Sequence, residues 1–196
     1  MANLDTPFGL KPIKHLMGAP WNGKVNTYYV PSTDGTAIFK GDAVKSAGSA
    51  DATGKFPSVA QAAAGDLIRG VVVGFGDNPY TMLHPDTPNR DYRPVSTAMY
   101  VFVVDDPFVI FEIQEDSTGN NLAATEVGLS TNLVVGSGST ATGKSAMELD
   151  SSDTATDGNG QCKILRVVDR EDNALGTNCK WEVLIVEHEL LVATDV

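Results

Sequence analysis

The clearest candidate for chemistry is Gly138–Ser145, which matches the phosphate-binding pattern G-x-x-x-x-G-K-[ST] at every fixed position. In that motif a helix begins at the lysine and serine, and its N-terminal amides and dipole hold the phosphates. Here the chain continues AMELDSSDTATDGNG, which leaves only a few residues before a polar, helix-breaking run. The alternating strand and helix pattern of a nucleotide-binding fold is also missing from the sequence. We therefore predict a flexible or hairpin loop with no bound nucleotide.

The histidines, cysteines and carboxylates are too dispersed to predict a metal or catalytic site. His188 lies between two glutamates, but alternation along a strand would turn it away from both, so we expect a solvated strand end. Cys162 and Cys179 match no zinc spacing and are too few for a disulfide framework, so we expect two small buried thiols. No nucleophile elbow or pair of carboxylates stands out. The sequence predicts a protein that is not an enzyme and that holds neither a cofactor nor a metal.

The charge of the chain argues against nucleic acid as a partner. Its net charge is −11, and an acidic surface repels phosphates. Residues 1–25 differ, because they carry Lys11, Lys14 and Lys24 against Asp5 alone. A mildly basic arm would suit docking onto an acidic neighbour, although solvated side chains remain the alternative. No apolar run approaches the ~18 residues of a membrane-spanning helix, and no signal peptide is evident, so we expect a cytosolic chain without a membrane partner.

The elements that would position these residues are mostly short strands. The densest run of β-branched and aromatic residues is Thr97–Gln114, and Asp105-Asp106-Pro107 divides it in the middle. Because aspartate and proline favour turns, this pattern predicts a central hairpin of Tyr100–Val104 with Phe108–Ile113.

A second hairpin is expected from Lys163–Val168 and Trp181–Glu187, and the one helix candidate is Leu122–Asn132. That helix is marginal because it is short and contains a glycine. About nine to eleven short strands separated by turn residues, with so little helix, are typical of a sandwich or barrel. We predict an all-β fold with at most one short helix and a β-sandwich, jelly-roll-like or β-barrel body at residues 21–196. A subdivision near residues 115–132 stays open.

Residues 1–20 are predicted to form an extended arm. Three prolines, Pro7, Pro12 and Pro20, forbid a helix there and favour extended backbone. The apolar residues between them would be unfavourable in water, so the arm should lie in a groove on its own body or on a neighbouring subunit. The anchors expected from this pattern are Phe8, Leu10, Ile13 and Leu16.

A long loop at Gly76–Pro94 is a second expected contact surface. It contains four prolines, and loops of this length within compact domains are usually functional. Its candidate contact residues are Pro79, Tyr80, His84 and Tyr92.

Four stretches, distributed over nearly the whole chain, carry a family resemblance. They are MANLDTPFGLKPIKHLMGAPWNGKVNTYYVPSTDGTAIFKGDAV at 1–44, GVVVGF at 70–75, GSGSTATGKSAMELDSS at 136–152 and DNALGTNCKWEVLIVEHEL at 172–190. Together they resemble a family of virion structural proteins of tailed bacteriophages, of the kind assigned as capsid cement or decoration proteins. Such proteins carry no catalytic residues, which further weakens the nucleotide interpretation of Lys144 and Ser145.

The resemblance implies a β-rich protein that binds the outside of an icosahedral phage head and ties neighbouring major capsid subunits together. Its implied partners are the major capsid protein and further copies of this chain, as a homodimer or homotrimer. The chain would be made in the host cytoplasm and reside on the capsid exterior of the virion. The alternative function is a head fibre or a host-surface-binding module that uses the loops at 76–94 and 150–160.

Overall fold

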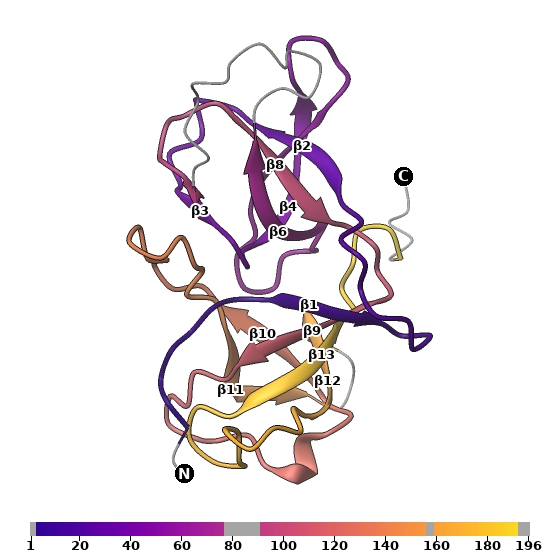
Figure 1. The fold of residues 1–196 in the computed structure, drawn as a ribbon, viewed down its shortest axis with the longest axis vertical. Coiled ribbons are helices and arrows are strands. Elements are labelled where there is room, and N and C mark those ends of the chain that lie inside the picture. Colours follow the sequence, from indigo (N-terminus) through magenta and orange to yellow (C-terminus); the bar gives the residue numbers. More distant parts are fainter. Residues whose placement is uncertain (1–2, 77–90, 156–158, 192–196) are drawn as a thin grey trace.

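The computed structural model describes residues 3–76, 91–155 and 159–191, and strands dominate its secondary structure, as the sequence predicts. A closed barrel and a six-stranded sheet lie one above the other, and β1 crosses between them (Figure 1). A small two-stranded sheet, β3 (Ile38–Phe39) with β7 (Tyr92–Arg93), lies beside the barrel. The one helical element within the described ranges is a 3-10 turn at Ala124–Glu126.

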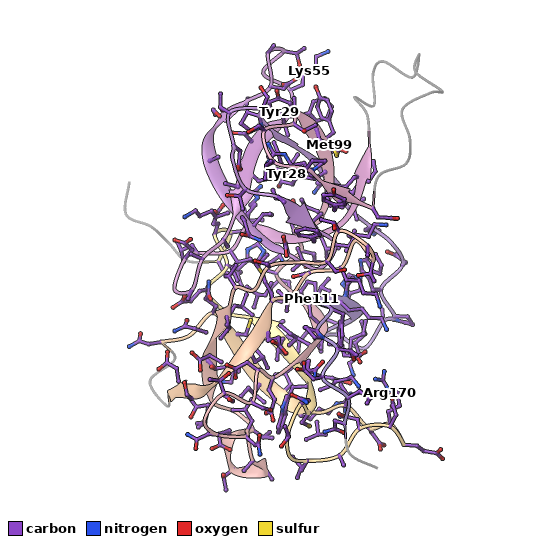
Figure 2. All side chains as sticks on the ribbon, turned by 90° about the vertical axis from the view of Figure 1, so that its left-hand side faces the viewer. Tyr28, Tyr29, Lys55, Met99, Phe111 and Arg170 are labelled. Carbon is purple, nitrogen blue, oxygen red and sulfur yellow. The ribbon has the colours of Figure 1, made fainter. Side chains whose placement is uncertain are left out.

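Five strands close the barrel in the order β2-β5-β4-β6-β8. They are β2 (Asn26–Val30), β4 (Ala43–Ala50), β5 (Pro57–Gln61), β6 (Gly70–Gly76) and β8 (Met99–Val104). Neighbours pair antiparallel except β2 and β5, which meet in parallel at Tyr29 and Ser58. Inward-facing valines and aromatic residues fill the interior, and Figure 2 shows Tyr28 and Met99 in this part of the molecule.

The six-stranded sheet has the order β1-β9-β13-β12-β10-β11. Its strands are β1 (Lys11–His15), β9 (Val109–Gln114), β10 (Ser130–Val134), β11 (Glu148–Ala155), β12 (Cys162–Val167) and β13 (Lys180–Ile185). The predicted hairpin of β12 with β13 is confirmed, with Ile164 opposite Val183. Cys162 and Cys179 are free, buried thiols in this core, as expected.

The predicted central hairpin is wrong, because its two strands belong to different sheets. β8 pairs with β2 and β6 in the barrel, whereas β9 pairs with β1 and β13. The segment Asp105-Asp106-Pro107 is therefore the crossover between barrel and sheet. The Asp105 carboxylate accepts hydrogen bonds from Asn26 Nδ2 at 2.9 Å and from the Tyr28 hydroxyl at 2.7 Å, which ties the crossover to β2. A turn signal marks a break in a strand but does not say which strands pair on either side.

The helix predicted at Leu122–Asn132 is also wrong. Leu122 is buried in the core, the 3-10 turn follows it, and Ser130 already begins β10. Gly128 has a φ of 92°, which a right-handed helix excludes. Pairing of β10 with β11 and β12 overrides the weak helix propensity of this segment.

One hydrophobic cluster joins the barrel to the sheet. Ala43, Val71 and Val104 contribute to it from the barrel, and Phe111 and Trp181 contribute from the sheet. Figure 2 places Phe111 near the middle of the molecule. Because apolar surface from both units leaves water at this junction, the hydrophobic effect holds the two units together.

A buried polar side chain reinforces the junction. Gln161 lies in the loop before β12 and is fully buried. Its Nε2 donates to the carbonyls of Ala63 and Asp66, at 2.9 and 2.8 Å, and its Oε1 accepts from the Leu133 amide at 3.0 Å. The same side chain thus bonds both to the segment at 63–66 on the barrel side and to β10 in the sheet. The expected single domain over residues 21–196 stays a prediction.

Candidate functional site

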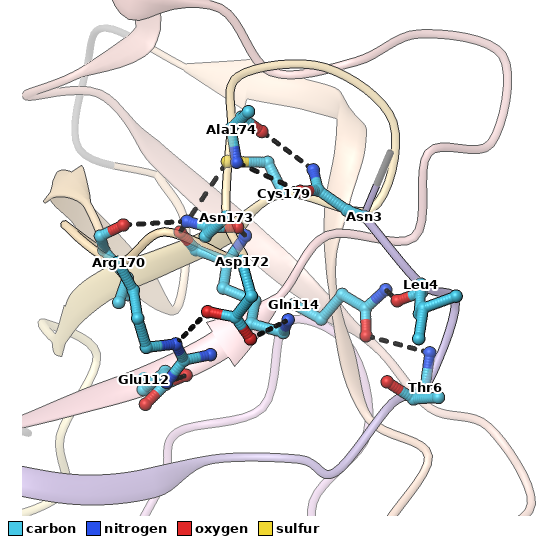
Figure 3. Close-up of polar contacts among 12 residues, drawn as sticks. Asn3, Leu4, Thr6, Glu112, Gln114, Arg170, Asp172, Asn173, Ala174 and Cys179 are labelled. Atoms are coloured by element: carbon cyan, nitrogen blue, oxygen red, sulfur yellow. Dashed lines mark hydrogen bonds and ion pairs between the residues drawn. The ribbon is translucent and has the colours of Figure 1, made fainter. Parts of the chain in front are cut away.

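The N-terminal arm is extended, and it lies on the chain's own body. Asn3 Nδ2 donates to the carbonyls of Ala174 and Thr177, at 2.7 and 2.9 Å (Figure 3). The buried Gln114 holds the next residues: its Nε2 donates to the Leu4 carbonyl at 3.0 Å, and its Oε1 accepts from the Thr6 amide at 3.2 Å. β1 then pairs with β9. The arm is therefore an integral part of the sheet.

The arm passes the segment before β4 at a close crossing of two backbones. The Leu10 amide donates to the Gly41 carbonyl at 2.9 Å. Gly9 and Gly41 have φ values of 72° and 97°, and a Cβ on Gly41 would lie 2.4 Å from the Phe8 carbonyl oxygen. Only glycine permits both this backbone conformation and this approach.

The four predicted anchors of the arm have different surroundings. Leu10 is 1% exposed and belongs to the cluster that joins barrel and sheet. Phe8 and Ile13 are half-buried, whereas Leu16 is 46% exposed just after β1. Of these four side chains, Leu16 has the most surface to offer to a partner.

An exposed apolar turn lies at the end of β1 and is formed by Leu16, Met17 and Phe108. Figure 1 shows the chain after β1 looping outward from the body on the right-hand side. Met17 is 92% exposed and Phe108 is 50% exposed. The Leu16 amide donates to the Phe108 carbonyl at 2.7 Å, so the turn after β1 and the crossover lie side by side. His15 Nδ1 lies 3.2 Å from Asp106 Oδ2 at the same place. Large apolar side chains gathered at a surface are typical of protein-binding sites.

An open groove with a volume of about 1140 Å³ lies next to the arm. One wall is formed by arm residues between 6 and 12, and another by residues of the loop at 137–146. Trp21, Val72 and Val73 also line it. The groove therefore brings together the arm and the phosphate-loop-like segment, which are far apart in the sequence.

Cationic side chains surround this groove although the chain as a whole is acidic. Those that line it are Lys11, Lys40, Lys144, Arg170 and Lys180. The one lining carboxylate among the described residues is Glu112. Figure 2 shows Arg170 toward the outside of the sheet half of the molecule, and Figure 3 shows it beside Glu112.

The phosphate-loop match at 138–145 lies on this groove without the helix of that motif. The Ser145 amide donates to the Lys40 carbonyl at 2.8 Å, and the chain then enters strand β11 at Glu148. The segment is a loop that leads into a strand, so the amides that hold phosphates at a helix start are not assembled here. Lys144 is exposed on this loop, and Ser139 and Thr142 line the same wall.

Most of the predicted contact loop falls outside the described residues, including Pro79, Tyr80 and His84. Tyr92 is described and lies in β7. Its ring stacks on that of Phe39, with ring centroids 5.1 Å apart and 10° between the planes. Tyr92 thus packs against the body and is only partly exposed.

The solvated position expected for His188 is wrong, because its side chain is 1% exposed. Residues 187–189 lie against the barrel, where the Ile68 amide donates to the Glu187 carbonyl at 2.8 Å and the Glu189 amide donates to the Ile68 carbonyl at 3.0 Å. His188 Nδ1 accepts from the Leu190 amide at 3.2 Å, whereas Nε2 has no partner among the described residues. Burial lowers the pKa of this imidazole. Strand alternation could not indicate that His188 is buried, because the burial results from contact with the segment at Ile68, which is distant in sequence.

Glu148 is an ionisable residue that the sequence reading overlooked. Burial, together with the nearby Asp5 and Asp116, raises the pKa of its carboxyl to about 7. Its Oε1 is buried without a hydrogen-bond partner among the described residues. Asp5 belongs to the arm and Asp116 follows β9. The pKa of Glu148 therefore depends on two carboxylates that lie where the arm meets the sheet.

Within the described ranges, no three His, Cys, Asp or Glu side chains gather in an arrangement that could hold a metal ion. In the same part of the chain no helix has the length and apolar character needed to cross a membrane.

Comparison of the chain with protein-family models, with curated proteins and with solved structures found no match.

Proposed function

We propose that this chain is a structural protein of a tailed-phage virion, a capsid cement or decoration protein without catalytic activity. It would bind the outer surface of the head and stabilise contacts between major capsid subunits. The sequence resemblance supports this role, and the observation that carries it in the structure is the apolar turn of Leu16, Met17 and Phe108. Covering these exposed apolar side chains with a protein partner would be favourable, because it removes them from water.

The construction of the arm also supports a cement role. Leu10 is buried, β1 is a strand of the sheet, and Gln114 holds the residues before it. The apolar turn is therefore attached to a firmly packed scaffold and loses little conformational entropy when it binds, which favours affinity.

The test is rebinding to heads of the encoding phage from which this protein has been stripped. The wild-type chain should bind at a fixed ratio to the major capsid protein, and Met17→Asp and Phe108→Asp should each lower the bound amount severalfold. Leu175→Asp is the matched control, because Leu175 is similarly exposed in a loop remote in sequence from the turn. Stripped heads that bind no wild-type protein, or that bind all variants equally, would refute the proposal.

A head fibre or host-surface-binding module is the second candidate. It would act through the loops at 76–94 and 150–160, and the first of these lies largely outside the described residues. We rank it below the cement role because the apolar turn lies elsewhere, at the end of β1. Binding of the purified chain to host cells, with Met17→Asp unaffected, would reverse this order.

A further inference from the structure

We propose that the groove between the arm and the loop at 137–146 binds an acidic, extended peptide segment of a partner protein. This inference goes beyond the proposed function and does not depend on it. It rests on the size of the groove, on its apolar lining and on the sign of the charge around it.

The dimensions suit a peptide better than a small metabolite. The groove has a volume of about 1140 Å³, whereas small-molecule sites usually measure roughly 300–1000 Å³. The arm lines one wall over residues 6 to 12, a stretch in which Gly9 has a φ of 72°. A partner segment lying alongside these residues would contact several of them at once.

The charge of the groove is opposite to that of the chain. Five cationic side chains line it against one carboxylate, in a chain of net charge −11. Ion pairs neutralise part of this charge: Arg170 lies 3.0 Å from Glu112 and Lys40 lies 2.9 Å from Asp91. Even when the carboxylates paired with the lining cations are included, the groove remains positive. Complementary potentials of this kind select an acidic partner and speed its encounter.

Asp172 is the other carboxylate in this balance. It lies 2.5 Å from Arg170 Nε and 3.9 Å from Lys180 Nζ. Lys180 is buried and Arg170 is half-exposed, and Figure 3 shows Arg170 beside Asp172. Arg170 and Lys180 therefore line the groove as cations that are already paired with Asp172.

Lys144 is the cation best placed to bind the partner. It is exposed, lines the groove and forms no ion pair with a described residue. Hydroxyl groups of Ser139 and Thr142 lie on the same wall and can donate to carboxylate oxygens. A flexible ammonium group beside hydroxyl donors is well suited to a carboxylate side chain.

The apolar lining distinguishes a peptide from a nucleic acid. Phe8, Trp21 and Val73 line the groove and are half-buried, so they retain apolar surface for leucine-like or aromatic side chains. A nucleic acid would extend beyond the groove, and a chain of net charge −11 would repel its phosphates. A short segment that combines carboxylates with apolar side chains fits both features.

The experiment is fluorescence anisotropy of the purified chain with a labelled synthetic peptide that alternates glutamate with leucine. We expect saturable binding that weakens as salt increases, and weaker binding by at least tenfold when glutamine replaces every glutamate. Lys144→Glu should raise the Kd by about tenfold, since it replaces attraction with repulsion, whereas Lys144→Arg should preserve binding. Lys163→Glu is the control, because Lys163 is exposed on β12 and does not line the groove.

Three results would overturn the inference. The first is equal binding of the glutamate and glutamine peptides. The second is an unchanged Kd for Lys144→Glu when its thermal unfolding matches that of the wild type. The third is tighter binding of a single-stranded oligonucleotide of similar length than of the acidic peptide, which would identify the groove as a polyanion site. Because the assay contains no phage heads, its failure is distinct from failure of the cement role.

Discussion

Arg93 shows how much of the barrel end depends on one side chain. It is fully buried, and its guanidinium donates to the backbone carbonyls of Pro31, Asp34, Thr36 and Thr97. Arg93→Leu removes these donors and leaves buried carbonyl groups without partners. We expect a loss of about 3 kcal/mol or more in the free energy of unfolding, measured by urea denaturation.

The control for this prediction is Lys163→Leu, an exposed change of similar kind on β12. It should alter the free energy of unfolding by no more than about 0.5 kcal/mol. If Arg93→Leu cost no more than this control, the guanidinium would not be holding the loop carbonyls together.

Glu148 gives a prediction for pH. Its pKa in the folded chain is raised to about 7 from an ordinary value of 4.5, so the folded state binds the proton more tightly than the unfolded state does. The contribution of Glu148 to the free energy of unfolding is therefore fully present below pH 4.5 and is lost as the pH rises to about 7. Glu148→Gln should therefore match the wild type near pH 4 and exceed it by about 1–2 kcal/mol near pH 8, since solvent screening reduces the full effect.

Chemical denaturation at several pH values measures this difference. Glu171→Gln, an exposed neutralisation in a loop, should show no such growth of the difference with pH. A difference between Glu148→Gln and the wild type that stays constant from pH 4 to pH 8 would contradict the assignment.

At the residue scale, the sequence could predict local chemistry but not contacts between distant segments. The loop at 138–145 and the two buried thiols follow from flanking residues and composition. The burial of His188 depends on Ile68, which is far away in the sequence. The groove also depends on contacts between distant segments, because its cations come from five separate places along the chain.

The arm and the segment before β4 fit closely where their backbones cross. Gly41→Ala places a Cβ 2.4 Å from the Phe8 carbonyl oxygen and also strains a backbone with a φ of 97°. Gly23→Ala is a matched control, because Gly23 has a φ of 83° and no atom within 4 Å of the added Cβ. Gly23→Ala should cost about 1 kcal/mol from backbone strain alone.

Gly41→Ala should cost at least about 2 kcal/mol more than Gly23→Ala, because the arm must move to relieve the clash. Hydrogen exchange should show faster exchange at the Leu10 amide and in β1 for Gly41→Ala only. Equal losses of stability for the two variants, with an unchanged exchange rate at Leu10, would show that the crossing does not hold the arm.

At the element scale, strand existence was predictable and strand partnership was not. The predicted hairpin of β12 and β13 is confirmed. It was predictable because the two strands follow one another in the chain and are joined by one loop. β8 and β9 are closer still in sequence, yet each finds partners elsewhere. Both are apolar enough to be covered on two faces, so alternation could not choose a sheet for either of them.

At the scale of the whole molecule, two β units share a core and expose two different surfaces. The apolar turn follows β1, and the cation-lined groove lies beside the arm before and at the start of β1. The arm thus contributes to both surfaces while its own anchor, Leu10, stays in the core. A scaffold that is fixed internally and carries separate contact surfaces suits a protein that bridges neighbours in an assembly.

The proposed capsid role is tested most directly by an electron cryo-microscopy map of the particle to which this chain is proposed to belong. We expect density for the barrel and the six-stranded sheet on the outside of the shell, with Leu16, Met17 and Phe108 covered by the major capsid protein. Heads that lack this density, or that carry it with the apolar turn facing solvent and no contact to the shell, would contradict the account.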